Sequence, residues 1–252
     1  MEPILRVDDL TKVFIRKGQP PFTAVDHISF EVQPGQCVGI IGESGSGKST
    51  AVNMIARLTD VTEGRIVLEG QDITRLSGRQ LKPAYRKLQM VFQSPMESFD
   101  PRRRLGDGIG ESLRNSGMAR SAVKAEVTRL LRLCGLPAEF AARYPHQVSG
   151  GQCQRAAIAR AIAIKPRLLI CDEATSALDV TIQREILALL QQLRQELGLS
   201  ILFICHDIAL VQQFCDRVLV MYRGGIVEEG VPDAVIRNPQ NDYTRHLIES
   251  VL

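Results

Sequence analysis

One short motif limits the folds open to this chain more than any other feature of its sequence. The motif is Gly42-Glu-Ser-Gly-Ser-Gly-Lys-Ser49, and it follows an apolar run at residues 37–41 and precedes a helical pattern. Glycines let backbone N–H groups wrap around an anion, and the N-terminus of the following helix adds positive potential. We therefore expect a strand, a phosphate-binding loop and a helix in that order, within an α/β fold.

The composition is that of an ordinary globular protein. The chain has 252 residues, of which 44% are hydrophobic and 23% are charged, and its net charge of +3 is too small to indicate nucleic-acid binding. Its longest apolar runs are strand-sized, far short of the ~20 residues of a membrane-spanning helix. No secretory signal is visible at the N-terminus, so we expect a cytosolic location. The six cysteines form no C-x-x-C pair and are interpreted as reduced core residues.

Short apolar runs alternate with helical patterns along most of the chain, which favours a largely parallel sheet. Strands are expected at residues 4–15, 24–32, 37–41, 65–69, 88–92, 167–171, 200–205 and 217–222. The segment 94–164 shows no strand pattern and is expected to be a helical insertion. Within it, Val123, Val127 and Leu130 mark one face of a helix, with Ser121 as its N-cap and Gly135 at its end. A second, longer helix is expected at residues 182–197, ended by Gly198.

A second chemical signal is the pair of carboxylates that ends the apolar run at residues 167–171. Because a phosphate loop lies upstream in the same chain, we expect Asp172 to help hold Mg²⁺. Glu173 is placed to polarise an attacking water as a general base. In the loop itself, Lys48 would reach the β- and γ-phosphates and Ser49 would offer its hydroxyl to Mg²⁺. These two motifs leave several classes of nucleoside triphosphatase open.

The motif Val148-Ser-Gly-Gly-Gln152 narrows the choice, because a serine and two glycines at a helix start form a second anion cradle. Here the chain resembles the ATP-binding subunits of ABC transporters, whose signature is usually written LSGGQ. The resemblance covers nearly the whole chain and implies one ABC ATP-binding domain over residues 1–252. It implies a RecA-like core with a mainly parallel sheet and an N-terminal antiparallel β subdomain, at about 1–93 and 165–252. A helical subdomain at about 94–164 would carry the signature.

The resemblance also implies a role for each motif residue. Residues implied to bind ATP are Phe14, as the aromatic that stacks on adenine, and Gly42, Glu43, Ser44, Gly45, Ser46, Gly47, Lys48, Ser49 and Thr50. Residues implied to contact the γ-phosphate held by the opposite subunit are Ser149, Gly150, Gly151 and Gln152. Those implied to be catalytic are Glu173, the switch histidine His206 and the Q-loop glutamine Gln93. Ser49, Gln93 and Asp172 would hold Mg²⁺, and the D-loop at 176–179 would place Asp179 at the dimer interface, where it could also cap a helix.

The chain also resembles the ATPase subunits of importers of oligopeptides, dipeptides and nickel, and is more similar to the shorter of their two ATPase subunits. The segments that carry this resemblance include 98–102, 144–146 and Asn238-Pro-Gln-Asn-Asp-Tyr-Thr244. This predicts an ATP-hydrolysing subunit at the cytoplasmic face of the membrane. Its expected partners are a second ATPase subunit, identical or different, transmembrane permease subunits and, indirectly, an extracytoplasmic solute-binding protein, with no nucleic acid. ATP and Mg²⁺ are the expected cofactors. The alternatives are a soluble ABC ATPase of cofactor assembly, DNA repair or translation, and a small-molecule kinase.

Overall fold

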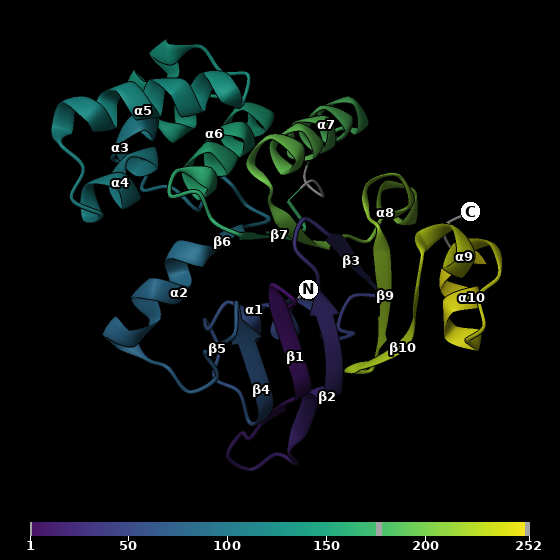
Figure 1. The fold of residues 1–252 in the computed structure, drawn as a ribbon. Helices are drawn as coiled ribbons and strands as arrows, with labels where there is room; N and C mark the ends of the chain where they lie inside the picture. Colours follow the sequence, from purple (N-terminus) through teal and green to yellow (C-terminus); the bar gives the residue numbers. More distant parts are fainter. Residues whose placement is uncertain (1, 175–177, 250–252) are drawn as a thin grey trace.

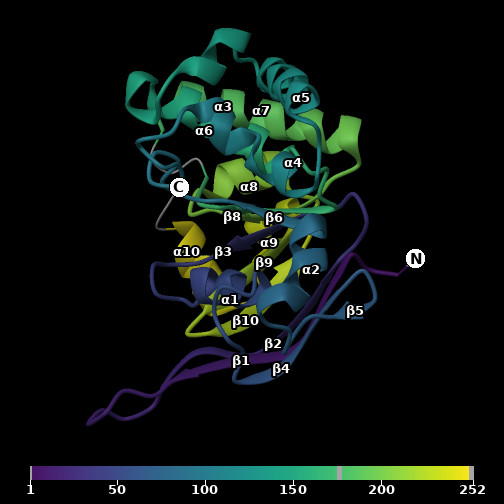
Figure 2. The same cartoon turned by 90° about the vertical axis from the view of Figure 1, so that its left-hand side faces the viewer.

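The computed structural model describes residues 2–174 and 178–249, which form two β-sheets flanked by helices (Figure 1). The first sheet is antiparallel, with strand order β2-β1-β4-β5. Its strands are β1 (Leu5–Phe14), β2 (Phe22–Val32), β4 (Glu63–Leu68) and β5 (Gln71–Asp72). The hairpin of β1 and β2 projects well beyond the rest of the molecule (Figure 2). This sheet confirms the antiparallel β subdomain expected in the N-terminal third.

The second sheet has the strand order β10-β9-β3-β8-β7-β6, and all its neighbouring strands are parallel except β9 and β10. Its strands are β3 (Cys37–Ile41), β6 (Leu88–Val91), β7 (Leu168–Asp172), β8 (Ser200–Ile204), β9 (Arg217–Tyr222) and β10 (Gly225–Gly230). Parallel strands bring their carboxyl ends to one edge of the sheet, where ligands of α/β proteins bind. The segments that follow β3, β7 and β8 therefore meet at one edge.

Helices cover the parallel sheet and extend away from it. They are α1 (Lys48–Ile55), α2 (Lys82–Lys87), α3 (Leu105–Ile109), α4 (Glu111–Asn115), α5 (Arg120–Leu133), α6 (Gly150–Ile162), α7 (Val180–Leu197), α8 (Ile208–Phe214), α9 (Pro232–Arg237) and α10 (Asp242–Glu249), with short 3₁₀ turns at Gly78–Leu81, Ala138–Ala142 and Pro145–Gln147. Helices α3 to α6 gather at the opposite end of the molecule from the antiparallel sheet (Figures 1 and 2). No strand occurs between residues 94 and 164, all of which the structure describes.

The core explains why the strand sequences are apolar without alternation. Successive residues of β8 belong to two different hydrophobic clusters: Ile201 and Phe203 pack in one, and Leu202 and Ile204 pack in the other. A strand covered on both faces is expected to be a continuous apolar run, because residues on both faces are buried. All six cysteines are buried and free. None of the helices in the described ranges is long and apolar enough to cross a membrane.

The helix predicted around Val123 forms as α5, with its apolar stripe buried and Gly135 just beyond its end at a φ of 72°. The N-cap prediction at Ser121 is wrong. The helix begins at Arg120, so Ser121 lies inside the first turn, and the N-cap is Ala119, whose side chain accepts no hydrogen bond. Strand β10 and helices α9 and α10 were not predicted, since the sequence beyond residue 222 has only short, mixed patterns.

Candidate active site

The phosphate loop connects β3 to α1 and needs glycine at two positions for steric reasons. Gly42 has a φ of 148° and Gly47 a φ of 105°. A Cβ at Gly42 would collide with the carbonyl oxygen of Met221, and one at Gly47 would collide with that of Ala24. The loop is therefore packed against its neighbours through its backbone, and it leads into the N-terminus of α1, which has no side-chain cap on its first N–H groups.

Lys48 is buried in the loop that precedes it. Its Nζ donates to the carbonyl oxygens of Gly42 at 2.7 Å and Glu43 at 2.8 Å. Burial lowers the pKa of Lys48, and the carboxylates of Glu173, Asp172 and Glu43 partly offset this effect. A cation held this way is already oriented toward the loop before any anion arrives.

The two carboxylates expected at the end of β7 differ in their surroundings. Asp172 Oδ1 is buried and has no hydrogen-bond partner within the part of the chain that the structure describes. Burial raises the pKa of Asp172, as does the nearby carboxylate of Glu173, while the ammonium of Lys48 opposes the shift. Glu173 adopts a left-handed backbone conformation with a φ of 48°, which is strained for a residue with a side chain.

His206 and Glu173 meet across the ends of β8 and β7. The imidazole Nε2 contacts Glu173 Oε1, although the two residues are far apart in sequence. The Glu173 side chain is 13% exposed and that of His206 is 44% exposed, so the contact lies at the wall of an open hollow. That hollow has a volume of about 210 Å³ and is lined by Phe22, Ala24, Ser44, Gly45, Gly47, Lys48, Ser49, Thr50, Glu173 and His206. The structure thus brings the expected phosphate loop, general base and switch histidine together.

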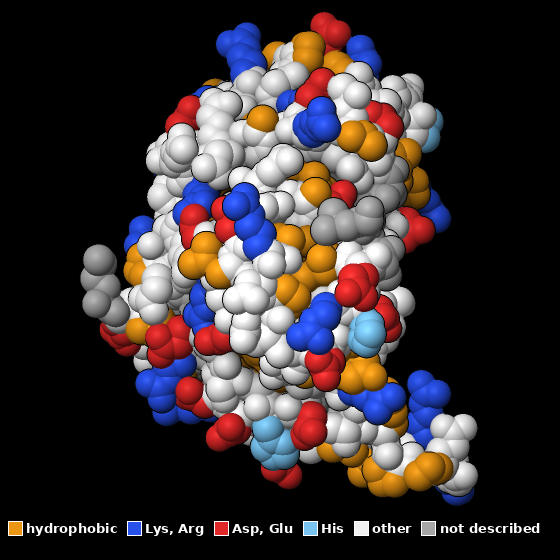
Figure 3. Space-filling model, turned by 90° about the vertical axis from the view of Figure 1, so that its right-hand side faces the viewer, with side chains coloured by type: hydrophobic (Ala, Val, Ile, Leu, Met, Phe, Trp, Pro, Cys, Tyr) orange, Lys and Arg blue, Asp and Glu red, His pale blue; other side chains and the backbone are white. Residues whose placement is uncertain are grey.

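A second hollow of about 560 Å³ lies beside the first and shares Phe22, Ala24 and Thr50 with it. Phe14, predicted to stack on adenine, lines this second hollow. Phe22 was missed by sequence reasoning, although it lies directly opposite Phe14 in the β1–β2 register. Residues directly opposite in an antiparallel pair project from the same face of the sheet. Figure 3 shows an arm extending from one corner of the molecule, with hydrophobic and basic side chains along it.

The signature residues lie outside both hollows. Ser149 is the N-cap of α6: its Oγ accepts from Gln152 N at 3.3 Å, and its own N–H donates to Gln152 Oε1 at 3.0 Å. Ser149, Gly151 and Gln152 line a separate hollow of about 440 Å³. Gly150 is the first residue of α6 and is exposed.

Gln93 and the D-loop complete the set of expected site residues. Gln93 is exposed, just beyond the end of β6, and it lines neither the phosphate hollow nor the one beside it. Asp179 is the N-cap of α7, with its Oδ1 accepting from Ile182 N at 3.0 Å. Ser176, at the start of the D-loop motif, lies outside the described residues.

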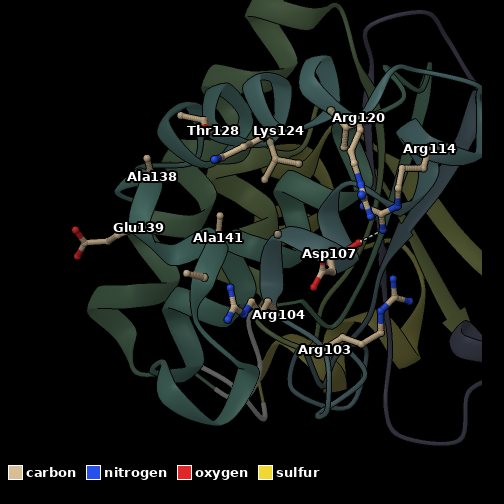
Figure 4. Close-up of a pocket in the computed structure, with 14 residues that line it drawn as sticks. Arg103, Arg104, Asp107, Arg114, Arg120, Lys124, Thr128, Ala138, Glu139 and Ala141 are labelled. Carbon is tan, nitrogen blue, oxygen red and sulfur yellow. Dashed lines mark hydrogen bonds between the residues drawn. The ribbon is translucent and has the colours of Figure 1, made fainter.

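A fourth hollow, of about 740 Å³, lies among the helices α3 to α5 and the turn at Ala138–Ala142. Figure 4 shows its basic side chains, including Arg103, Arg104, Arg114, Arg120 and Lys124. Arg103 pairs with Glu111 at 2.9 Å, and Arg114 donates to the backbone oxygen of Asp107. The side chains of Arg104, Arg120 and Lys124 make no ion pair with any residue in the described ranges. We call this hollow the cationic groove.

Comparison with known sequences gives one family and several curated relatives. The model of the ABC transporter family matches residues 25–176. The glutathione import ATP-binding protein GsiA of Salmonella typhimurium is 46% identical over 257 positions, covering 99% of this chain and 41% of GsiA. A putative peptide import ATP-binding protein of Brucella abortus is 44% identical, covering 99% of this chain and 77% of the relative. The chain thus spans about two fifths of the length of GsiA.

Comparison with solved structures gives the same fold. One is described as the dimeric structure of a post-hydrolysis state of the ATP-binding cassette MJ0796 bound to ADP and Pi. It matches with a TM-score of 0.83 and 29% identity, covering 90% of this chain and 98% of that one. Another is CbiO1 from Clostridium perfringens, part of the ABC transporter complex CbiONQ. It matches with a TM-score of 0.82 and 27% identity, covering 99% of this chain and 100% of that one.

Proposed function

The chain belongs to the ABC transporter family, with the fold of its ATPase cassettes, and from this premise we propose that it hydrolyses ATP to power the import of small peptides. The observation that carries the proposal is the meeting of Lys48, Glu173 and His206 in one hollow at the carboxyl edge of the parallel sheet. Such a hollow offers a cation and backbone N–H groups to phosphate, with a carboxylate beside them.

Each group in the hollow has a chemical role in this proposal. Lys48 and the N–H groups at the start of α1 bind the phosphates of ATP and stabilise the negative charge that develops on transfer. Glu173 accepts a proton from the attacking water. A general base must lie within hydrogen-bond reach of the proton that it abstracts, and Glu173 lines the hollow. His206, which contacts Glu173 Oε1, positions that carboxylate. Phe14 and Phe22 line the neighbouring hollow, where the adenine base of ATP would stack.

The chemistry of Asp172 fits a magnesium ion. Asp172 Oδ1 is a buried carboxylate oxygen without a hydrogen-bond partner among the described residues, and such an oxygen is costly to bury unless a cation is bound to it. Carboxylate and hydroxyl oxygens are ligands that Mg²⁺ prefers. We propose that Asp172, Ser49 and Gln93 hold Mg²⁺, which when bound neutralises charge on the phosphates.

We further propose that two subunits complete each ATP site. Within one chain, Ser149 and the phosphate loop line separate hollows. The N-terminus of α6, with Ser149 as its cap, offers N–H groups to a second anion. A dimer in which α6 of one subunit faces the phosphate loop of the other would use both sites, and the MJ0796 relative is described as a dimer. The second subunit is either a copy of this chain or a different one.

The partner in the membrane is proposed to be a permease that docks at the cationic groove and holds the chain at the cytoplasmic face. Arg104, Arg120 and Lys124 present unpaired positive charge there, which fits a permease segment carrying carboxylates. Support for the solute class comes from the relatives, which are named for peptide and for glutathione import, and glutathione is itself a small peptide.

The test of ATP hydrolysis is the variant Glu173→Gln, which keeps the shape of the side chain and removes its basicity. We expect MgATP binding to be retained, steady-state hydrolysis to fall by about 10²-fold or more, and a nucleotide-bound dimer to accumulate on size-exclusion chromatography. Glu196→Gln, the same change at an exposed glutamate of α7, is the matched control and should hydrolyse ATP at the wild-type rate. Full hydrolysis by Glu173→Gln would refute the assignment of the general base.

A further inference from the structure

The C-terminal helix α10 contacts the phosphate loop through one hydrogen bond. Glu43 N in the loop donates to Tyr243 Oη of α10 at 3.0 Å, across 200 residues of sequence. Tyr243 belongs to the segment 238–244, to which the proposed reaction gives no role. Its ring is partly buried and burial raises the pKa of Tyr243, so its hydroxyl stays neutral near pH 7 and can accept this bond.

Several contacts fix α10 in the position from which Tyr243 reaches the loop. The Tyr243 ring stacks on that of Tyr222, at the end of β9, with centroids 4.0 Å apart and planes inclined by 25°. Glu228 of β10 accepts from Gln240 N at 2.8 Å and from Asn241 N at 3.0 Å. Asn241 Oδ1 in turn accepts from Tyr243 N at 2.9 Å at the start of the helix. The hydroxyl is therefore presented by a segment bound to the edge of the parallel sheet.

Glu43 is the residue through which this contact reaches the site. Its N–H is bound by Tyr243, and its carbonyl oxygen accepts from Lys48 Nζ at 2.8 Å and from Ser46 N at 3.2 Å. A shift of the backbone at Glu43 would therefore move an acceptor that orients the Lys48 ammonium. The Glu43 side chain is exposed, so the side chain itself does not hold the residue in the core.

We propose that Tyr243 is a positioning residue for ATP binding: its hydroxyl holds the Glu43 peptide so that the phosphate loop presents Lys48 to the nucleotide. The inference rests on the proposed function, since it concerns the same phosphate site. It gives the C-terminal segment 238–249 a part in nucleotide affinity, although none of its residues lines the phosphate hollow.

The test compares two variants that each remove one hydroxyl from a pair of stacked rings. Tyr243→Phe removes the acceptor for Glu43 N, whereas Tyr222→Phe is the matched control, because no hydrogen bond of the Tyr222 hydroxyl occurs among the described residues. We expect Tyr243→Phe to weaken MgATP binding about three- to tenfold by calorimetry, the range for one lost positioning hydrogen bond, and Tyr222→Phe to bind like the wild type. In ATPase assays the KM of Tyr243→Phe should rise with kcat nearly unchanged.

Hydrogen exchange of the nucleotide-free protein gives a second readout at the loop itself. Backbone amides of residues 42–47 should exchange faster in Tyr243→Phe than in Tyr222→Phe, and Glu228→Ala, which releases the turn before α10, should reproduce both effects. Equal MgATP affinity and equal exchange in the two phenylalanine variants would overturn the inference while leaving the proposed function intact. Failure of the wild type to bind MgATP would instead overturn the proposed function.

Discussion

Phe14 and Phe22 face one hollow, but their rings are not equally available to a nucleotide base. Lys12 Nζ lies 5.1 Å from the centroid of the Phe14 ring and also donates to the backbone oxygen of Asp60 at 2.6 Å, so an ammonium group covers one face of that ring. Phe22 is 62% exposed against 38% for Phe14 and lines both hollows. Phe22 is therefore the better placed of the two to contact a base whose phosphates occupy the loop.

The variant Phe22→Ala tests this difference, because it removes a stacking surface and leaves every residue of the phosphate loop unchanged. Stacking of a base on an aromatic ring contributes about 1–3 kcal/mol, so we expect MgATP affinity to fall at least about fivefold by calorimetry. Binding of inorganic tripolyphosphate, which has no base, should not change. Ile15→Ala, at an exposed apolar residue of the same hairpin that lines neither hollow, is the control. Equal MgATP affinity in Phe22→Ala and Ile15→Ala would contradict the stacking role.

Helix α5 begins without a side-chain cap, which leaves backbone N–H groups in its first turn without an internal partner. Ala119, the N-cap, has the extended backbone conformation of capping residues, with a φ of −60° and a ψ of 143°. Ala119→Ser should supply the missing acceptor and stabilise the protein by about 0.5–1 kcal/mol. For a chain of this size that corresponds to a rise in Tm of about 1–4 °C in a thermal unfolding scan.

Ser121→Ala is the matched control for the capping prediction, since it removes a hydroxyl two residues further along, inside the first turn. Its side chain is exposed and we expect little change in Tm. A lower Tm for Ser121→Ala, with no gain for Ala119→Ser, would mean that Ser121 caps the helix, as the sequence pattern predicts.

Elements were predictable from the sequence where local signals agreed, and were missed where contacts distant in sequence decide the structure. The strands at 37–41 and 217–222 have the expected bounds, since both are apolar runs bounded by polar or glycine-containing turns. Strand β10 (Gly225–Gly230) contains two glutamates and forms at the sheet edge because it pairs with β9. The contacts of Phe22 and Tyr243 were missed for the same reason. The register of β2 places Phe22 and the packing of α10 places Tyr243, and no local sequence pattern indicates either contact.

At the scale of the whole molecule, the cationic groove lies apart from the nucleotide hollows and places unpaired positive charge among the helices α3 to α5. Like charges in one groove repel each other, and an acidic partner segment would relieve that repulsion. If the groove docks a permease, nucleotide binding and partner binding use different surfaces of the chain and can be separated by mutation. None of Arg104, Arg120 and Lys124 lines a hollow that we assign to ATP.

The double variant Arg104→Glu with Lys124→Glu reverses the charge at this groove. We expect MgATP binding by the purified chain to be unchanged and recovery of multi-spanning permease subunits, identified by mass spectrometry after detergent purification, to fall at least about tenfold, since like charges across an interface cost several kcal/mol. Arg132→Glu, on the same helix α5 but outside the groove, is the control and should recover the permease at the wild-type level. Undiminished recovery by the double variant would place the docking surface elsewhere, and a stable complex of the wild type without any membrane-spanning subunit would favour a soluble ATPase of the same family.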